Sequence, residues 1–286
     1  MAAWRCTIAV ECAGVSRLIS MILKKAVKKT DQAQPVAELA LPEMSHAARE
    51  ALRSYTPARI GLARSGVSLA TRPLLEFQLA HARARDAVHA AIDVRMVCDE
   101  LRRCALAPLA LESRAKDRAT YLRRPDLGRR LSEESAALLS PGEYDVVFVI
   151  ADGLSALAVE RHALRLLRAV LPFIAGWRLS PVCVVEQGRV AIGDEIGEAL
   201  QASMTVVLIG ERPGLSSPDS MGVYLTWDPR RGRRDSERNC ISNIREEGLE
   251  YGAAAGRLQY YMQEASRRHM SGLGLKDPAA DVAKLL

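Results

Sequence analysis

The sequence predicts an α/β protein in which a helical N-terminal part precedes a mainly parallel sheet domain. From about residue 144, short β-branched runs alternate with helical segments, and such alternation favours parallel strands joined by right-handed crossovers. Acidic residues follow three of these runs, at Asp152, Glu186 and Glu211. Before residue 140, apolar residues instead recur at helical spacing. We therefore expect a mainly helical region over 45–140 and an α/β domain over 141–286.

The length and periodicity of each run define the expected elements. Apolar runs of roughly 4–8 residues are typical of buried strands, and longer stretches with a 3.6-residue period are typical of helices. In the first region, 72–88 keeps a helical apolar period, and a further helix can begin at Pro125. In the second, the expected strands are 146–150, 181–186, 205–209 and 221–227, and the expected helices are 154 to about 175, about 194–202 and about 249–270.

Polar residues cluster where the expected strands end. The strand at 205–209 stops abruptly in a Gly-Glu-Arg-Pro-Gly loop. In open α/β sheets, ligands bind outside the carboxyl ends of the strands. Carboxylates there would accept hydrogen bonds from ligand amides, and backbone N–H groups would donate to ligand oxygens. Strand-end capping or turn formation explains the same residues at any single position. The candidate edge comprises Asp152-Gly153, Gly188-Arg189-Val190, Glu211-Arg212 and 239–243.

Composition allows a sizeable core and indicates an anionic ligand or partner. The chain has 286 residues, 49% of them hydrophobic, and a net charge of +6. Basic residues concentrate in 114–130 and 229–238. Such clusters form either solvated surfaces or contacts with phosphate or an acidic protein face. No stretch approaches the ~20 apolar residues of a membrane span, so we expect no membrane segment.

The spacing of cysteine and histidine argues against several kinds of site. The six cysteines include no Cys-x-x-Cys pair and suggest no disulfide framework, which is typical of a reducing compartment. Cys183 lies inside an apolar run and is expected to be a buried thiol. The chain has neither a P-loop nor a G-x-G-x-x-G turn, and its five histidines show no metal spacing. We therefore predict no catalytic residue and no metal site within this chain.

Residues 1–44 are expected to form a variable N-terminal extension. Residues 15–29 place apolar and basic side chains on opposite faces of a short helix, and a polar linker follows. A secretory signal fits poorly because the cations follow the apolar stretch, whereas a mitochondrial presequence fits on composition alone. Met21 is an alternative start. The helix resembles in general form those that direct enzymes into bacterial microcompartments, and a terminus without a role is the alternative.

Six segments of the chain form a recognisable set. They are ARIGLARSG (58–66), YLRRPDLGRRL (121–131), VIADGLS (149–155), GRVAIGDEIGEAL (188–200), VVLIGERPGL (206–215) and CISNI (240–244). In these segments, and in their order and approximate spacing from about residue 58 to 244, the chain resembles the small (light) subunit of ethanolamine ammonia-lyase. As a set the segments are specific.

The resemblance implies a Rossmann-like C-terminal part and an adenosylcobalamin-dependent lyase that converts ethanolamine into acetaldehyde and ammonia by a radical rearrangement. In that family a TIM-barrel large subunit holds the substrate and the catalytic residues, and the small subunit covers the cobalamin that lies between them. The family's cobalamin-contacting positions fall on Val190 in GRV, Glu211 in GERPG and Cys240 in CISN.

The resemblance also implies how the cofactor and the partner are arranged. Cobalamin enzymes that displace the lower base use a D-x-H-x-x-G motif, which this sequence lacks; this agrees with the family's base-on mode. We expect a hetero-oligomer with equal numbers of both subunits, in the cytoplasm or in a bacterial microcompartment.

Two other functions remain open on the sequence. The basic stretches suit a nucleic-acid-binding module, although aromatic residues make up only 5% of the chain and no standard motif is present. We therefore expect no nucleic acid. A structural relative that assembles without cofactor is the third reading.

Overall fold

The computed structural model describes residues 51–56 and 58–276. The chain divides into two compact units, Met1–Gly61 and Leu62–Leu286. The second unit contains the sheet and every helix named below. The extension predicted over 1–44 lies outside the described residues, so its helix and its linker stay predictions.

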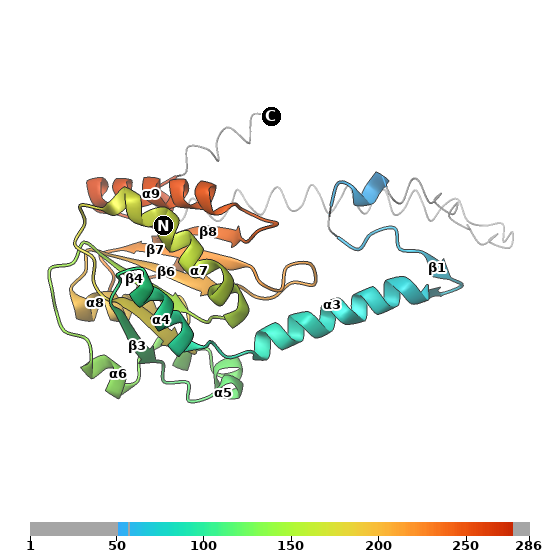
Figure 1. Cartoon of the computed structure of the whole chain (residues 1–286), viewed down its shortest axis with the longest axis horizontal. Helices are drawn as coiled ribbons and strands as arrows, with labels where there is room; N and C mark the ends of the chain where they lie inside the picture. The colour runs from blue at the N-terminus through green and yellow to red at the C-terminus, as the bar shows by residue number, and fades with distance from the viewer. Residues whose placement is uncertain (1–50, 57, 277–286) are drawn as a thin grey trace, which may run out of the picture. The chain divides into compact units, whose positions relative to one another are not determined.

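A six-stranded sheet forms the centre of the second unit (Figure 1). Its order is β3-β5-β4-β6-β7-β8, in which β3, β5, β4 and β6 are mutually parallel and β7 and β8 are antiparallel to their neighbours. The sheet is thus mainly parallel, as the sequence predicts. The strands are β3 (Pro108–Glu112), β4 (Val146–Ala151), β5 (Val182–Glu186), β6 (Met204–Gly210), β7 (Met221–Trp227) and β8 (Arg238–Ile244). A short hairpin, β1 (Arg64–Ser65) with β2 (Ser68–Leu69), precedes it.

The central strands match their predicted bounds closely because both of their faces are buried. All residues of β4 and β6 are buried, and continuous apolar runs are typical of strands covered on both faces. β7 coincides with the predicted run at 221–227. Only residues 211–220 join β6 to β7, which is too short for the crossover that a parallel pair requires, so β7 is antiparallel.

The six-stranded sheet contains two strands that the sequence did not predict, β3 and β8. β3 lies within the region predicted to be mainly helical and pairs in parallel with β5 from Pro108 to Glu112. β8 contains the segment at 239–243 that the sequence placed at the candidate edge. The same N-terminal region supplies α3 (Thr71–His89), α4 (Val94–Arg103), α5 (Arg118–Arg123) and α6 (Glu133–Ala137).

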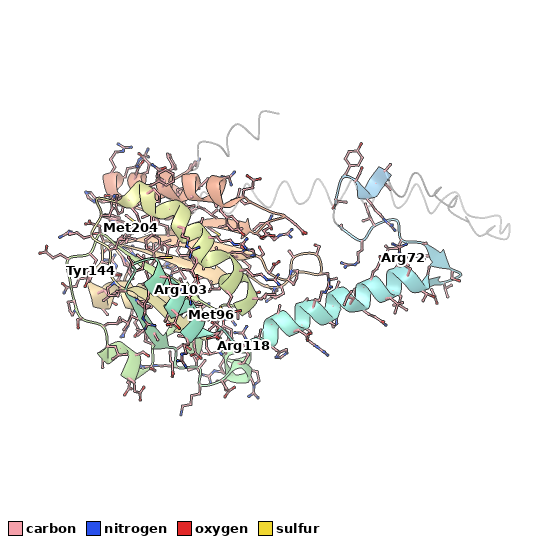
Figure 2. The ribbon with its side chains drawn as sticks, viewed as in Figure 1. Arg72, Met96, Arg103, Arg118, Tyr144 and Met204 are labelled. Atoms are coloured by element: carbon pink, nitrogen blue, oxygen red, sulfur yellow. The ribbon has the colours of Figure 1, made fainter. Side chains whose placement is uncertain are left out.

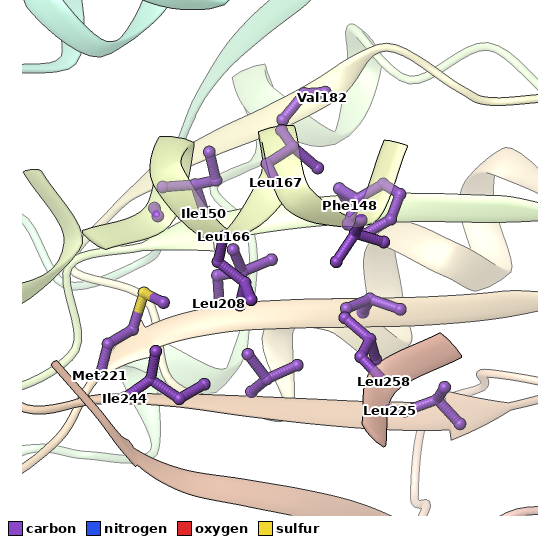
Figure 3. Packing of buried hydrophobic residues seen from close by; sticks show 14 of the residues in the cluster. Phe148, Ile150, Leu166, Leu167, Val182, Leu208, Met221, Leu225, Ile244 and Leu258 are labelled. Atoms are coloured by element: carbon purple, nitrogen blue, oxygen red, sulfur yellow. The ribbon is translucent and has the colours of Figure 1, made fainter. Parts of the chain in front are cut away.

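Helices cover the two faces of the sheet unequally. α7 (Ala156–Val170) and α9 (Tyr251–Arg268) lie on one face together with α4, whereas α8 (Ile192–Leu200) packs on the other (Figure 1). Figure 3 shows Leu166 and Leu167 of α7 against Ile150 and Leu208 of the sheet. Burying each such side chain contributes roughly 1.5–3 kcal/mol. The larger core therefore lies beneath α7 and α9.

The sequence of α7 explains where that helix begins and what it covers. The side chain of Ser155 accepts a hydrogen bond from the Ala158 N–H and caps the first turn. Apolar residues at helical spacing then face the sheet, including Val159, Ala163 and Val170. A 3₁₀ turn over Leu171–Ile174 extends the segment to the predicted end of the helix near 175.

The 19-residue helix α3 differs from the other long helices, α4, α7, α8 and α9, because only Ala87 is buried on it. Among the residues that the structure describes, α3 carries four exposed large apolar side chains, Leu74, Leu75, Phe77 and Leu79. Several exposed large apolar side chains on one helix are typical of a protein interface.

Candidate functional site

The connections of the sheet predict where a ligand crevice would open. The chain leaves β4 toward α7 on one face and leaves β5 toward α8 on the other face. Adjacent parallel strands with opposite connections create a crevice at their carboxyl ends, where open α/β sheets bind ligands. The residues at this crevice are Asp152 and Gly153 after β4, and Gln187 and Gly188 after β5.

Arg118 fills this crevice. Its Nη1 donates to Asp152 Oδ2 at 3.2 Å, to Gly153 O at 2.9 Å and to Gln187 Oε1 at 3.2 Å. Its Nε donates to Val88 O at the end of α3, at 2.7 Å, and Figure 2 labels Arg118 beside that end. The usual ligand position of the fold is therefore occupied by a side chain of the protein.

Asp152 is fully buried beneath this guanidinium. Burial raises the pKa of Asp152 to about 6, against the lowering effects of Arg118 and of backbone N–H groups. Asp152 Oδ1 accepts a hydrogen bond from Gly188 N at 3.0 Å. The sequence predicted that Asp152 faces a ligand. The structure shows instead that its buried carboxylate fixes the loop after β5.

Tyr121 of α5 fixes the same loop from the other side. Its hydroxyl donates to Gly188 O at 3.0 Å, and its ring is completely buried. The guanidinium of Arg189 lies 4.1 Å from the ring centroid. Because this loop leads directly to Val190 and α8, these contacts determine where Val190 stands.

The three residues expected at the cofactor lie on one face of the sheet, the face that α8 partly covers. Val190 is half-buried at the start of α8 and packs against the smaller core. On β7, Met221, Val223 and Leu225 point into the larger core, so Gly222 and Tyr224 point to the α8 face. Cys240 pairs with Tyr224 across the β7–β8 ladder and therefore shares that face.

Glu211 lies over Gly222 at the end of β6. Its Oε2 accepts hydrogen bonds from Ser220 Oγ at 2.5 Å and from Asn243 N at 3.3 Å. Among the described residues, its Oε1 has no hydrogen-bond donor. A Cβ at Gly222 would stand 2.9 Å from this Oε1, so any residue larger than glycine would displace the carboxylate. One carboxylate oxygen is thereby held in place and the other remains available to a ligand.

Tyr224 and Cys240 form the middle of this face. The two residues lie opposite each other across the β7–β8 ladder, and desolvation raises the pKa of both, with a further increase at Tyr224 from Cys240 and Glu211. A thiol with a raised pKa stays protonated at neutral pH and is a poor nucleophile. The pair therefore provides a neutral surface that can contact an uncharged ligand.

Most of this face beyond α8 is uncovered. α8 ends at Leu200, and on β8 the outward residues Cys240 and Ser242 are exposed. We name the surface formed by Val190, Glu211, Tyr224, Cys240 and Ser242 the open face. It offers apolar contact, two hydroxyls, a thiol and one carboxylate oxygen, a set that suits a large neutral ligand bearing amides.

Glu186, the third acidic strand end, lies outside the open face. Glu186 pairs with Glu112 across the β3–β5 ladder, and burial together with Glu112 raises its pKa. The three acidic strand ends therefore share the carboxyl edge of the sheet, but of the three only Glu211 belongs to the open face.

Metal and membrane features are absent from the part of the chain that the structure describes. No group of three His, Cys, Asp or Glu side chains there could hold a metal ion. No described helix combines the length and the apolarity that a membrane crossing needs. The predicted burial of Cys183 is confirmed, since its thiol is fully enclosed and its pKa is raised to about 12.

The basic cluster at 229–238 is largely paired within the protein. Arg238 forms a buried two-point ion pair with Asp194, at 2.5 and 2.7 Å. Arg231 pairs with Glu195, and Arg233 pairs with Asp228 and Glu237. Arg231 and Arg238 thereby hold the segment after β7 against α8. Much of the positive charge of this cluster is thus neutralised within the protein.

Sequence reasoning missed several residues of the site. Arg118 stood in a basic stretch and was expected either on a solvated surface or in contact with an anion. Gly222 and Tyr224 lay in a predicted strand without an assigned face. The alternation of this strand places both residues on one side, but only the pairing with β8 shows that Cys240 stands beside them.

Comparison with known proteins identifies the family. Residues 46–276 match the family model for ethanolamine ammonia-lyase light chain (EutC). The chain is 58% identical over 236 residues to the ethanolamine ammonia-lyase small subunit of Pseudomonas aeruginosa PAO1, covering 80% of this chain and 86% of that protein. It is 57% identical over 242 residues to the small subunit of Azotobacter vinelandii, covering 82% and 89%. The chain therefore belongs to the ethanolamine ammonia-lyase light-chain family and is part of a lyase.

Proposed function

We propose that this chain is the small subunit of an adenosylcobalamin-dependent ethanolamine ammonia-lyase and that its open face holds the cobalamin against a large subunit. One observation carries the proposal: Val190, Glu211 and Cys240, which lie far apart in the sequence, all stand on the face of the sheet that α8 only partly covers. The names of the relatives support the same role.

The open face fits the chemistry of this cofactor. Cobalamin is large and carries many neutral amide side chains around an apolar ring. The free Oε1 of Glu211 can accept an amide N–H, and the side chains of Val190 and Tyr224 provide apolar contact. When bound, adenosylcobalamin supplies the carbon-centred radical that begins the conversion of ethanolamine into acetaldehyde and ammonia.

The residues of this chain act by binding and positioning. Arg118, Asp152 and Tyr121 fix the loop that carries Val190. Ser220 and Asn243 orient Glu211. We propose, as the resemblance implies, that this chain supplies no catalytic residue; the raised pKa of the Cys240 thiol keeps it protonated at neutral pH and argues against a nucleophilic role for it. Substrate binding and proton transfers then belong to the large subunit, which we propose to be a TIM barrel.

The exposed apolar residues of α3 support assembly with that partner. Leu74, Leu75 and Leu79 have no covering element in the second unit and would be buried on docking. We propose a hetero-oligomer with equal numbers of small and large subunits, located in the cytoplasm, with enclosure in a bacterial microcompartment as the alternative.

The alternatives predict different binding behaviour. A nucleic-acid-binding module would use the basic clusters, but Arg231, Arg233 and Arg238 are engaged in ion pairs. A cofactor-free structural relative would assemble with a large subunit and bind no cobalamin.

Co-expression with a large subunit tests the proposal. The purified complex should retain cobalamin absorbance and release ammonia from ethanolamine only when adenosylcobalamin is present, and the single chain should do neither. Assembly without cobalamin binding would instead support the structural relative. A salt-sensitive gel shift of nucleic acid by the complex, without cobalamin binding, would support the nucleic-acid module.

A further inference from the structure

A hollow of about 450 Å³ opens at the carboxyl edge of the sheet. Its walls come from α3, α5 and the loops that follow β4, β5 and β6. This volume falls within the roughly 300–1,000 Å³ of small-molecule sites. The side chains that matter for its chemistry are His81, Arg85, Leu122, Arg189, Arg212 and Leu215.

The hollow is cationic. Three arginines and one histidine line it, and the lining residues, all within the described ranges, include no Asp or Glu. An arginine is always charged in a protein and matches the planar geometry of phosphate or carboxylate oxygens. The hollow therefore suits an anion and would repel a second cation.

Two of these arginines are available to a ligand. Arg189 stacks on Tyr121, and its Nη2 donates to Tyr121 O at a long 3.5 Å, whereas its Nε is buried with no hydrogen-bond partner among the described residues. Arg212 forms no ion pair or hydrogen bond within the described part of the chain, and Pro213 restricts the backbone beside it. Buried donors without partners are uncommon in native proteins and call for an acceptor.

The hollow adjoins the open face through two pairs of consecutive residues. Arg189 directly precedes Val190, and Arg212 directly follows Glu211. In each pair the arginine lines the hollow and its neighbour belongs to the open face. The hollow and the open face therefore share two short segments of backbone, 189–190 and 211–212.

Resting on the proposed function, we infer that this hollow binds the phosphodiester of the nucleotide loop of cobalamin. The amides around the corrin ring are neutral, so the phosphodiester is the group of that ligand that matches a cationic hollow. Arg212 and Arg189 donate to its oxygens, and Leu122 and Leu215 contact the attached sugar. An acidic side chain of the large subunit is the competing occupant.

Cobinamide provides the matched probe because it keeps the corrin ring and its amides but lacks the phosphodiester, the ribose and the benzimidazole. The apo complex of this chain with the large subunit is titrated with cyanocobalamin and with cobinamide, following absorbance. Arg212→Met should weaken cyanocobalamin binding about tenfold or more, because a hydrogen bond to a charged group contributes roughly 1.5–3 kcal/mol. The affinity for cobinamide should change less than about twofold.

Control variants separate this effect from changes in net charge and in folding. Arg95→Met removes the same charge from an exposed position on α4 and should leave both affinities unchanged. Arg212→Lys keeps the charge but loses the two-point geometry, and should recover part of the affinity for cyanocobalamin. Far-ultraviolet circular dichroism of each variant checks the fold.

Three results would overturn the inference. If Arg212→Met leaves cyanocobalamin binding unchanged, or weakens both ligands equally, the hollow does not bind the phosphodiester. If the variant dissociates from the large subunit while the assembled fraction binds both ligands normally, the occupant is an acidic group of the partner. If the unmodified complex binds neither ligand, the proposed function itself fails, an outcome distinct from the first two.

Discussion

Arg118 and Asp152 form a buried ion pair at the carboxyl end of the sheet, with Nη1 3.2 Å from Oδ2. The side chain of Asp152 is fully buried and that of Arg118 is 12% exposed. Because Asp152 also holds the loop after β5, this pair connects α5, β4 and the segment that carries Val190. It occupies the crevice that ligands use in related architectures, so the proposed ligand site lies on the neighbouring open face.

Replacing Arg118 with methionine should destabilise the protein by about 3–5 kcal/mol, because it leaves a buried carboxylate without its partner. The pKa of Asp152, already raised to about 6, should rise further. A raised carboxyl pKa means that the native state binds more protons than the unfolded chain, so the free energy of unfolding falls as pH rises through the interval between the two pKa values. In the variant, the free energy of unfolding should continue to fall above pH 6. Urea unfolding measured from pH 5 to 8 would detect this decrease.

The double variant Arg118→Met with Asp152→Asn provides the control for that prediction. It removes the buried charge together with its partner, so it should recover part of the stability and lose the pH dependence above pH 6. Equal destabilisation in the single and double variants would show that the two side chains do not depend on each other.

Glu211→Ala should weaken cobalamin binding by the assembled complex roughly tenfold or more, since a lost charge-assisted hydrogen bond costs about 1.5–3 kcal/mol. The KM for ethanolamine should change much less. Glu143→Ala serves as the control because Glu143 is exposed and stands just before β4, at the opposite edge of the sheet. A cobalamin dissociation constant unaffected by Glu211→Ala would remove Glu211 from the site.

Gly222→Ala tests whether the position of the Glu211 carboxylate matters. The added Cβ would stand 2.9 Å from Glu211 Oε1 and 3.3 Å from Glu211 Cγ, so the carboxylate must shift. Cobalamin affinity should fall with Gly222→Ala. In contrast, Gly256→Ala on α9 meets no atom within 4 Å and should raise stability by about 0.4–1 kcal/mol without affecting cobalamin. Calorimetry and cofactor titration of both variants would check this contrast.

Cobalamin should protect Cys240 from alkylation in the assembled complex. Cys240 is exposed on the open face, and its raised pKa predicts slow labelling by iodoacetamide at pH 7 that accelerates as pH rises. Peptide mass spectrometry reports each thiol separately. Cys104, partly exposed at the end of α4, should label equally with and without cobalamin. Equal labelling of Cys240 in both samples would contradict its place beneath the cofactor.

Deleting residues 1–44 should leave turnover with the large subunit nearly unchanged, because the predicted extension contributes little to the core. If its basic amphipathic helix directs the enzyme to a microcompartment, the same deletion should abolish co-localisation with shell proteins. A fluorescent protein fused to residues 15–35 should then co-localise with the shell proteins. Loss of turnover on deletion would instead show that the segment packs into the enzyme.

The sequence by itself determined the elements whose formation depends on local pattern. The buried runs at 146–150 and 221–227 appear in the structure with closely matching bounds. A strand that is apolar along its whole length is removed from water only when both of its faces are covered. The helix predicted from residue 154 and the acidic strand end at Glu211 follow from the same local reasoning. Motif order also determined the family.

Only the tertiary structure decided the pairings between distant segments. Pro108–Glu112 becomes a strand because β5 offers it an edge of unpaired backbone groups, which no local pattern reveals. Arg118 is buried and Cys240 lies beside Tyr224 because α5 and β8 bring them there. Such contacts join residues that are far apart along the chain, so their energies depend on the whole fold rather than on the neighbouring sequence.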